Sequence, residues 1–215
     1  MDVREVTIPV RNVELVADVV LPPDPVGVVL FAHGSGSSRH SPRNVAVARV
    51  LNQRALGTVL VDLLTPAEDA VDSRTAELRF NIELLADRLA AIVDWLGAAE
   101  ATQGLPIGLF GASTGAAAAL VSAAARPRQV SAVVSRGGRP DLARSALAAV
   151  RAPTLLLVGG FDDEVIALNE QASSQLPGTV ELNVVPGATH LFEEPGTLDR
   201  VTAAAGDWFT RHLTR

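Results

Sequence analysis

The chain has 215 residues, of which 48% are hydrophobic and 20% charged, which excludes a disordered protein and predicts a single globular domain over residues 1–215. Its formal net charge of −6 argues against binding to nucleic acid or to an anionic membrane through bulk charge. The absence of cysteine excludes disulfides, thiolate metal sites and a cysteine nucleophile.

Apolar runs alternate with helical patterns along most of the chain. Two strands around a short turn come first, at residues 3–10 and 13–21, and prolines end the second of them. Further strands are predicted at residues 26–32, 58–63, 106–110, 130–135, 154–158 and 180–185. Helices are predicted at residues 44–55, 75–98, 114–125, 141–150, 165–176 and 198–213, with a loop at 33–44 and a polar surface excursion at 65–73.

This order of elements predicts an α/β fold. Alternation of strands and helices gives a mostly parallel sheet with helices on both faces, and the opening pair would be its antiparallel N-terminal edge. The run V-G-V-V-L-F-A at residues 26–32 is typical of a strand that is buried on both faces. Ligands bind at the carboxyl ends of the strands in such sheets, so we expect functional residues in the loops that follow strands.

A G-x-S-x-G motif lies between a predicted strand and a predicted helix. Residues 105–115 read L-P-I-G-L-F-G-A-S-T-G, with Ser113 at the centre of the motif. This context is typical of a nucleophile elbow, a turn that holds the serine in a sparsely allowed backbone conformation and exposes its hydroxyl. Gly111 and Gly115 would be required because a side chain at either position would clash with the adjoining strand or helix. The alternative is a glycine-rich turn with an incidental serine.

A serine hydroxyl needs an adjacent base, and the base needs an acid to orient it. His190, in V-V-P-G-A-T-H-L-F, follows the last predicted strand, where a base can reach Ser113; a purely structural histidine is the alternative. The segment L-L-L-V-G-G-F-D-D-E-V offers Asp162 and Asp163 as acids. We favour Asp162, in a G-x-D placement from Gly160, because Asp163 is better suited to the first turn of the next helix. A helix-cap role for Asp162 is the alternative.

The loop after the third strand suggests an oxyanion hole. Residues 31–40 read F-A-H-G-S-G-S-S-R-H. One backbone N–H would come from Thr114, the residue after the nucleophile, and the second from Ser35, with Gly34 as the alternative. We expect His33 to brace this loop through hydrogen bonds and not to act as the base.

Arginines in two of the loops are candidate substrate-binding residues. Arg43 follows the third strand, and Arg136 follows the sixth. Either residue would hold a substrate carboxylate or phosphate. The alternative is that the loop arginines are solvated or form salt bridges to Glu77 and Glu193.

Metal, membrane and export signals are absent from the sequence. Four histidines without an H-E-x-x-H spacing predict no metal, and no cofactor is expected. The first ten residues lack the basic and apolar regions of a signal peptide, and no apolar run reaches the ~18–20 residues of a membrane-spanning helix. We therefore expect a cytoplasmic protein that binds neither nucleic acid nor membrane. A homodimer stays open, since no residue pattern fixes the oligomeric state.

The segments H-G-S-G, G-A-S-T-G, V-G-G-F-D and G-A-T-H, in this order, resemble the α/β-hydrolase superfamily. The small size and the lack of an inserted cap resemble its dienelactone-hydrolase-like group. The resemblance covers about residues 13–213 and implies an α/β-hydrolase fold with little or no cap domain and the triad Ser113, Asp162 and His190. Stretches such as S-R-G-G-R-P-D-L are similar to a bacterial subgroup in which some members are fused to phosphoribosyltransferase-like domains; no such domain is expected here.

The residues and the resemblance together predict a serine esterase acting on small-molecule esters or lactones. His190 would take the proton as Ser113 attacks the carbonyl, and water would then hydrolyse the acyl-enzyme. Dienelactone hydrolase itself uses a cysteine nucleophile, so its specialised substrate is not carried over to a chain with serine at position 113. The alternatives are a non-catalytic, receptor-like binding protein with this fold and an accessory module to a phosphoribosyltransferase-type enzyme.

Overall fold

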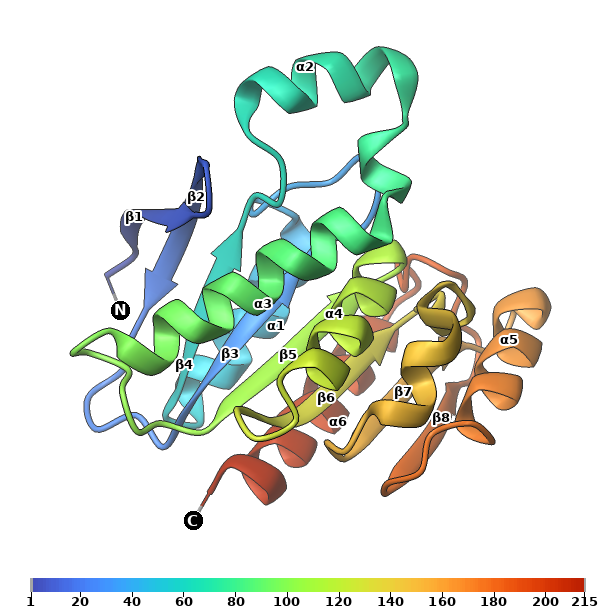
Figure 1. The fold of residues 1–215 in the computed structure, drawn as a ribbon. Helices are drawn as coiled ribbons and strands as arrows, with labels where there is room; N and C mark the ends of the chain where they lie inside the picture. Colours follow the sequence, from blue (N-terminus) through green and yellow to red (C-terminus); the bar gives the residue numbers. More distant parts are fainter. Residues whose placement is uncertain (1, 215) are drawn as a thin grey trace.

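An eight-stranded sheet runs through the computed structural model, which describes residues 2–214 (Figure 1). The strands are β1 (Arg4–Val10), β2 (Val13–Val20), β3 (Gly27–Ala32), β4 (Leu56–Val61), β5 (Ile107–Ala112), β6 (Val130–Arg136), β7 (Thr154–Gly159) and β8 (Val180–Val185). Their order across the sheet is β1-β2-β4-β3-β5-β6-β7-β8. Antiparallel pairing occurs between β1 and β2 and between β2 and β4, whereas the other neighbours are parallel. The predicted mostly parallel sheet with an antiparallel N-terminal edge is confirmed.

Helices cover both faces of this sheet. They are α1 (Pro42–Gln53), α2 (Pro66–Thr75), η1 (Leu78–Phe80), α3 (Ile82–Ala98), α4 (Thr114–Ala125), η2 (Pro140–Ala149), α5 (Asp163–Ser173) and α6 (Thr197–Leu213). Figure 1 shows α3 and α4 in front of the sheet and α1 and α6 behind it, and each pair packs on its own hydrophobic cluster. Every side chain of β3, β4, β5 and β7 is buried, as expected for strands with helices on both sides.

The long helix predicted at residues 75–98 begins later in the structure. It starts at Ile82, where the side chain of Asn81 accepts a hydrogen bond from the backbone N–H of Leu84 over 3.0 Å. Ala76 takes the left-handed conformation at φ 58°, which ends the preceding helix. The apolar spacing continues across this break, and only the capping residues mark it. The sequence prediction therefore began the helix too early.

The polar segment predicted as an excursion at residues 65–73 contains the helix α2. Its start is a capping box: the hydroxyl of Thr65 accepts the N–H of Glu68, and the Glu68 carboxylate accepts the N–H of Thr65. Figure 1 shows α2 standing out from the sheet. The segment predicted as a helix at residues 141–150 is the 3₁₀ segment η2, which is interrupted where Arg144 adopts φ 50°.

Candidate active site

Ser113 occupies a sharp turn between β5 and α4. Its backbone angles are φ 50° and ψ −122°, a conformation that non-glycine residues rarely adopt. A Cβ atom on Gly115 would lie 2.3 Å from the carbonyl oxygen of Ala32, and one on Gly111 would lie 2.4 Å from the Cα of Ala116. Both predicted glycine requirements are confirmed, and the turn has the geometry of a nucleophile elbow.

Backbone hydrogen bonds hold Ser113 in this strained turn. Its N–H donates to the carbonyl of Arg136 over 3.2 Å, and its carbonyl accepts N–H groups of Ala116 and Arg139, each over 3.1 Å. Within residues 2–214 the Ser113 hydroxyl has no hydrogen bond. The backbone is thus fixed by neighbouring segments, while the hydroxyl stays available for a substrate or a base.

Asp162 pairs with His190. The Asp162 carboxylate oxygen Oδ2 lies 2.6 Å from His190 Nδ1. Asp162 stands at the N-cap position of α5, but its side chain makes no capping bond and is directed to the imidazole. Asp163 and Glu164 occupy the first turn of α5, where the helix dipole favours acids. Of the two aspartates that the sequence offered, Asp162 is therefore the one that contacts His190.

The His190 ring lies on the backbone that supports Ser113. Gly137, at φ 50°, faces this ring: a Cβ there would lie 3.5 Å from His190 Cε1 and 3.1 Å from the His190 carbonyl oxygen. The preceding residue, Arg136, accepts the Ser113 N–H. With Nδ1 bonded to Asp162, the Nε2 atom is the nitrogen left to act as a base. No hydrogen bond joins His190 to Ser113 in the described part of the chain; such bonds often form only when substrate is present.

The two candidate oxyanion donors lie side by side but differ in their partners. Thr114 is the first residue of α4, where a backbone N–H has no partner inside the helix. The N–H of Ser35 donates to the Thr114 hydroxyl over 3.0 Å, so it already has a partner inside the protein. Gly34 packs directly on the nucleophile, because a Cβ there would lie 3.1 Å from Ser113 Cβ. The loop is thus in place, and Gly34 and Ser35 both stay candidates for the second donor.

His33 braces this loop through both ring nitrogens. Nδ1 lies 3.0 Å from the carbonyl oxygen of Gly34, and the N–H of Leu63 donates to Nε2 over 3.2 Å. These two bonds require a proton on Nδ1 and none on Nε2. Burial lowers the pKa of His33, so the neutral ring is favoured. The contacts fit the bracing role expected from the sequence.

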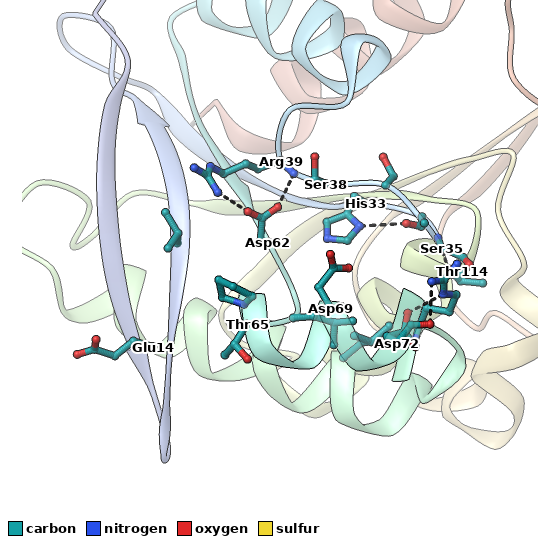
Figure 2. Close-up of a pocket in the computed structure, with 18 residues that line it drawn as sticks. Glu14, His33, Ser35, Ser38, Arg39, Asp62, Thr65, Asp69, Asp72 and Thr114 are labelled. Carbon is teal, nitrogen blue, oxygen red and sulfur yellow. Dashed lines mark hydrogen bonds and ion pairs between the residues drawn. The ribbon is translucent and has the colours of Figure 1, made fainter. Parts of the chain in front are cut away.

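A cavity of about 240 Å³ adjoins the candidate oxyanion donors (Figure 2). The loop at residues 33–39 lines one side of it, residues 64–72 of the α2 segment line another, and Thr114 lies at its edge. Figure 2 shows the Asp62 and Asp69 side chains near the His33 ring. Asp62 forms an ion pair with Arg39. The cavity offers room for part of a small substrate, and the sequence did not reveal it because α2 was not predicted.

A family model for the alpha/beta hydrolase domain matches residues 25–207. The chain belongs to the α/β-hydrolase family. A crystal structure of a dienelactone hydrolase from Anabaena variabilis ATCC 29413 is 56% identical to this α/β-hydrolase, with a TM-score of 0.97 over 99% of this chain and 98% of that one. The predicted resemblance to the dienelactone-hydrolase-like group is thereby confirmed. Est1E from Butyrivibrio proteoclasticus, at 17% identity and a TM-score of 0.79 over 97% of this chain and 98% of that chain, shares the fold.

Two curated Mycobacterium tuberculosis proteins, from strains CDC 1551 and H37Rv, carry the provisional name phosphoribosyl transferase and are also similar to this chain. Each is 54% identical over 210 residues, which is 98% of this chain and 46% of the relative. The α/β-hydrolase thus spans about half the length of these relatives. The family match and the dienelactone hydrolase neighbour together support hydrolytic activity.

The two candidate substrate-binding arginines of this α/β-hydrolase have different surroundings. Arg43 Nη1 donates to Glu193 over 2.9 Å, which is one of the salt bridges that the sequence offered as an alternative. Within the described residues, Glu77 pairs with no arginine. Arg136 is buried and has no carboxylate partner in the described chain. The sequence placed both arginines in loops, whereas Arg43 lies in the first turn of α1 and Arg136 is the last residue of β6. No local pattern indicated which of them is unpaired.

Residues 2–214 contain neither a candidate metal site nor a helix that could span a membrane. In this part of the chain no three His, Asp or Glu side chains are grouped so that they could hold a metal ion. None of the helices described there combines the length and apolar character that crossing a membrane requires.

Proposed function

We propose that this α/β-hydrolase is a serine hydrolase that cleaves carboxylic esters or lactones through an acyl-enzyme. The observation that carries the proposal is the 2.6 Å contact between Asp162 and His190 at the sheet edge where Ser113 occupies its strained elbow. Family membership and the 56% identical dienelactone hydrolase support hydrolysis as the reaction class. Because residue 113 is serine, the group that attacks the substrate carbonyl would be a hydroxyl.

In the first step, the Ser113 hydroxyl oxygen attacks the substrate carbonyl while His190 Nε2 takes its proton. Asp162 holds the Nδ1 proton and stabilises the imidazolium that forms. The N–H of Thr114, together with a backbone N–H of Gly34 or Ser35, stabilises the negative oxygen. His190 then returns the proton to the leaving alcohol as the carbon–oxygen bond breaks. Water, activated by His190, hydrolyses the acyl-enzyme and restores Ser113.

A fluorophosphonate probe tests this proposal directly. The wild-type protein is expected to gain one probe adduct by mass, on Ser113, and to hydrolyse short 4-nitrophenyl esters or lactones. Ser113→Ala is expected to lose the adduct and about 10⁴-fold or more in kcat. Ser174→Ala, just beyond the C-terminal end of α5, is the matched control and retains both. Labelling of Ser113→Ala at the wild-type rate would exclude Ser113 as the nucleophile.

Asp162→Asn provides a second arm for the triad. Because asparagine would hold the wrong imidazole tautomer, kcat is expected to fall by about 10³- to 10⁴-fold. Asp163→Asn, one position further along in the first turn of α5, is expected to change kcat by less than about twofold. Equal losses in the two variants would contradict the role proposed for Asp162.

A second function is favoured by one observation, the 46% coverage of the M. tuberculosis relatives. In this alternative the chain is a non-catalytic binding unit or an accessory module to a phosphoribosyltransferase-type enzyme. It predicts that the protein turns over no short ester or lactone, whether or not Ser113 reacts with the probe. Turnover that depends on Ser113 would rule it out.

A further inference from the structure

Arg136 is a buried guanidinium for which the protein supplies no carboxylate. It ends β6, and its side chain is only 7% exposed. Nη2 donates to Asn44 Oδ1 over 3.4 Å, near the limit for a hydrogen bond. In the described chain the buried atoms Nε and Nη1 have no partner at all. Burial lowers the pKa of Arg136 to about 10, so the group is still charged near neutral pH. A buried and unpaired charge is strongly unfavourable unless a ligand of opposite charge pairs with it.

Two other arginines, Arg139 and Arg39, form ion pairs with carboxylates of the protein. Arg139, three residues after Arg136, makes two bonds to Asp141 over 2.8 and 2.9 Å. Arg39 contacts Asp62 through its side chain and its backbone. The lack of a carboxylate is thus specific to Arg136 and is not a general property of the arginines in these loops.

The backbone of Arg136 contacts the candidate catalytic residues, and its guanidinium lies near the segment that follows His190. The backbone carbonyl of Arg136 accepts the Ser113 N–H, and the adjacent Gly137 faces the His190 ring. The guanidinium carbon lies 6.0 Å from the ring centroid of Phe192, two residues after His190. The side chain therefore lies where the end of β6, the start of α1 and the loop after β8 meet.

Arg43 places a second positive charge at this junction. It is close enough to lower the pKa of Arg136 further, and its own buried Nε has no partner in the described residues. Its only carboxylate contact there is with Glu193, whose side chain is 63% exposed. The N-terminus of α1, where Arg43 and Asn44 lie, adds partial positive charge. Two guanidiniums repel each other at this site unless an anion lies between or beside them.

We propose that Arg136, assisted by Arg43, forms an anion-binding subsite of the catalytic centre, and that the natural substrate is an ester with a carboxylate or phosphate group. This inference rests on the proposed function for its reaction, and it adds the substrate class. Nε and Nη1, which have no partner in the described residues, can each donate a charge-assisted hydrogen bond to an oxygen of such a group. The anion would be held near the loop that carries His190, and the charged group could belong to the acyl part or the alcohol part of the ester.

Matched pairs of esters test the subsite. The monoester of adipic acid with 4-nitrophenol is compared with 4-nitrophenyl hexanoate, and 3-acetoxybenzoate is compared with 3-acetoxybenzamide. The two pairs place the charge on the acyl side and on the alcohol side. In Arg136→Met, kcat/KM for at least one anionic ester is expected to fall about tenfold or more, while its neutral partner changes less than about twofold. Arg139→Gln is the matched control and affects both esters equally and slightly.

Two further readouts separate this inference from the proposed function and from a structural role. Inorganic phosphate and benzoate are expected to raise the Tm of the wild-type protein and not that of Arg136→Met, a measurement that needs no activity. The larger of the two shifts identifies phosphate or carboxylate as the preferred group. Without added anions, Arg136→Met is expected to melt at or above the wild-type temperature, because an unpaired charge has been removed.

The outcomes are distinct. An equal loss of kcat/KM on anionic and neutral esters, with a lower Tm for Arg136→Met, would show that Arg136 is structural and would overturn the inference. Hydrolysis of neutral esters by a protein that shows no anion-dependent Tm shift would also overturn it, while leaving the proposed function intact. An anion-dependent Tm shift in a protein that hydrolyses no ester would overturn the proposed function and retain the subsite.

Discussion

Two buried arginines, Arg88 on α3 and Arg136 at the end of β6, have opposite surroundings. Arg88 is 5% exposed and donates to both carboxylate oxygens of Glu68, over 2.6 and 2.8 Å, and to the carbonyl of Leu63 over 2.6 Å. Arg136 is 7% exposed and has one long bond to the neutral side chain of Asn44. The two guanidiniums are thus similarly buried, but within the described chain Arg88 is paired with a carboxylate of the protein and Arg136 is not.

The difference indicates what each guanidinium does. Arg88 joins α2 to α3 and so fixes the segment that walls the cavity next to Thr114. Because its partner belongs to the protein, its charge is already compensated in the unliganded state. Arg136 lies beside the candidate nucleophile, and its compensation has to come from outside the described chain. Whether a buried charge is structural or functional therefore depends on its partner more than on its depth.

The largest expected effect comes from making Arg88 resemble Arg136. Glu68→Ala removes the carboxylate and the capping box, leaves Arg88 buried and unpaired, and is expected to lower the free energy of unfolding by about 3 kcal/mol. Arg136→Met, which removes the other unpaired charge, is expected to raise it by about 1 kcal/mol. Urea unfolding at pH 7 measures both. A loss of similar size in the two variants would remove the distinction between the arginines.

The sequence predicted more of the sheet, the Ser113 turn and the Asp162–His190 contact than of the surroundings of these arginines. The apolar patterns of the strands and the glycines around Ser113 follow local rules, so β8 and α4 were predicted to the residue and Asp162 was preferred correctly as the neighbour of His190. These features depend on spacing and on the order of elements, both of which can be read along the chain.

The features that escaped prediction depend on contacts between distant segments. The apolar spacing at residues 75–98 concealed the break before Ile82, and α2 has a weakly apolar sequence that is held by Arg88, twenty positions after Glu68. The bond from the Ser35 N–H to the Thr114 hydroxyl spans 79 positions. No local pattern reports whether Arg136 has a carboxylate beside it, because that depends on how α1 and the loop after β8 pack.

Asn44→Asp reverses the comparison by giving Arg136 a partner. The new carboxylate would lie where Asn44 Oδ1 already approaches Arg136 Nη2, in the first turn of α1, where the helix dipole favours an acid. We expect the free energy of unfolding to rise by about 1–2 kcal/mol and the preference for anionic esters to disappear. The double variant with Arg136→Met isolates the coupling between the two side chains. If Asn44→Asp raises the free energy of unfolding by the same amount in the Arg136→Met background as in wild type, the gain comes from the helix dipole alone.

The pH dependence of stability distinguishes the two arginines without substituting either. The hydrogen bonds from Arg88 lower the pKa of Glu68 from 4.5 to about 2, so the pair stabilises the fold fully above pH 4.5. This stabilisation is lost as the pH falls from 4.5 towards 2, because the unfolded protein then binds the proton more tightly. The difference in unfolding free energy between wild type and Glu68→Ala should therefore narrow in urea titrations from pH 7 to pH 3. A difference that stays constant across this range would contradict the assignment.

The smallest expected effect concerns Arg43, which combines features of both arginines. Its bond to Glu193 is largely exposed, so Arg43→Gln should change the free energy of unfolding by less than about 0.5 kcal/mol. Its buried Nε and its proximity to Arg136 nevertheless predict a two- to fourfold loss of kcat/KM, by order of magnitude, on the preferred anionic ester. Glu193→Gln, which removes the competing carboxylate and leaves both guanidiniums, should increase that kcat/KM by a similar factor. Changes of the same sign in the two variants would mean that the Arg43–Glu193 pair positions the loop and that Arg136 alone holds the anion.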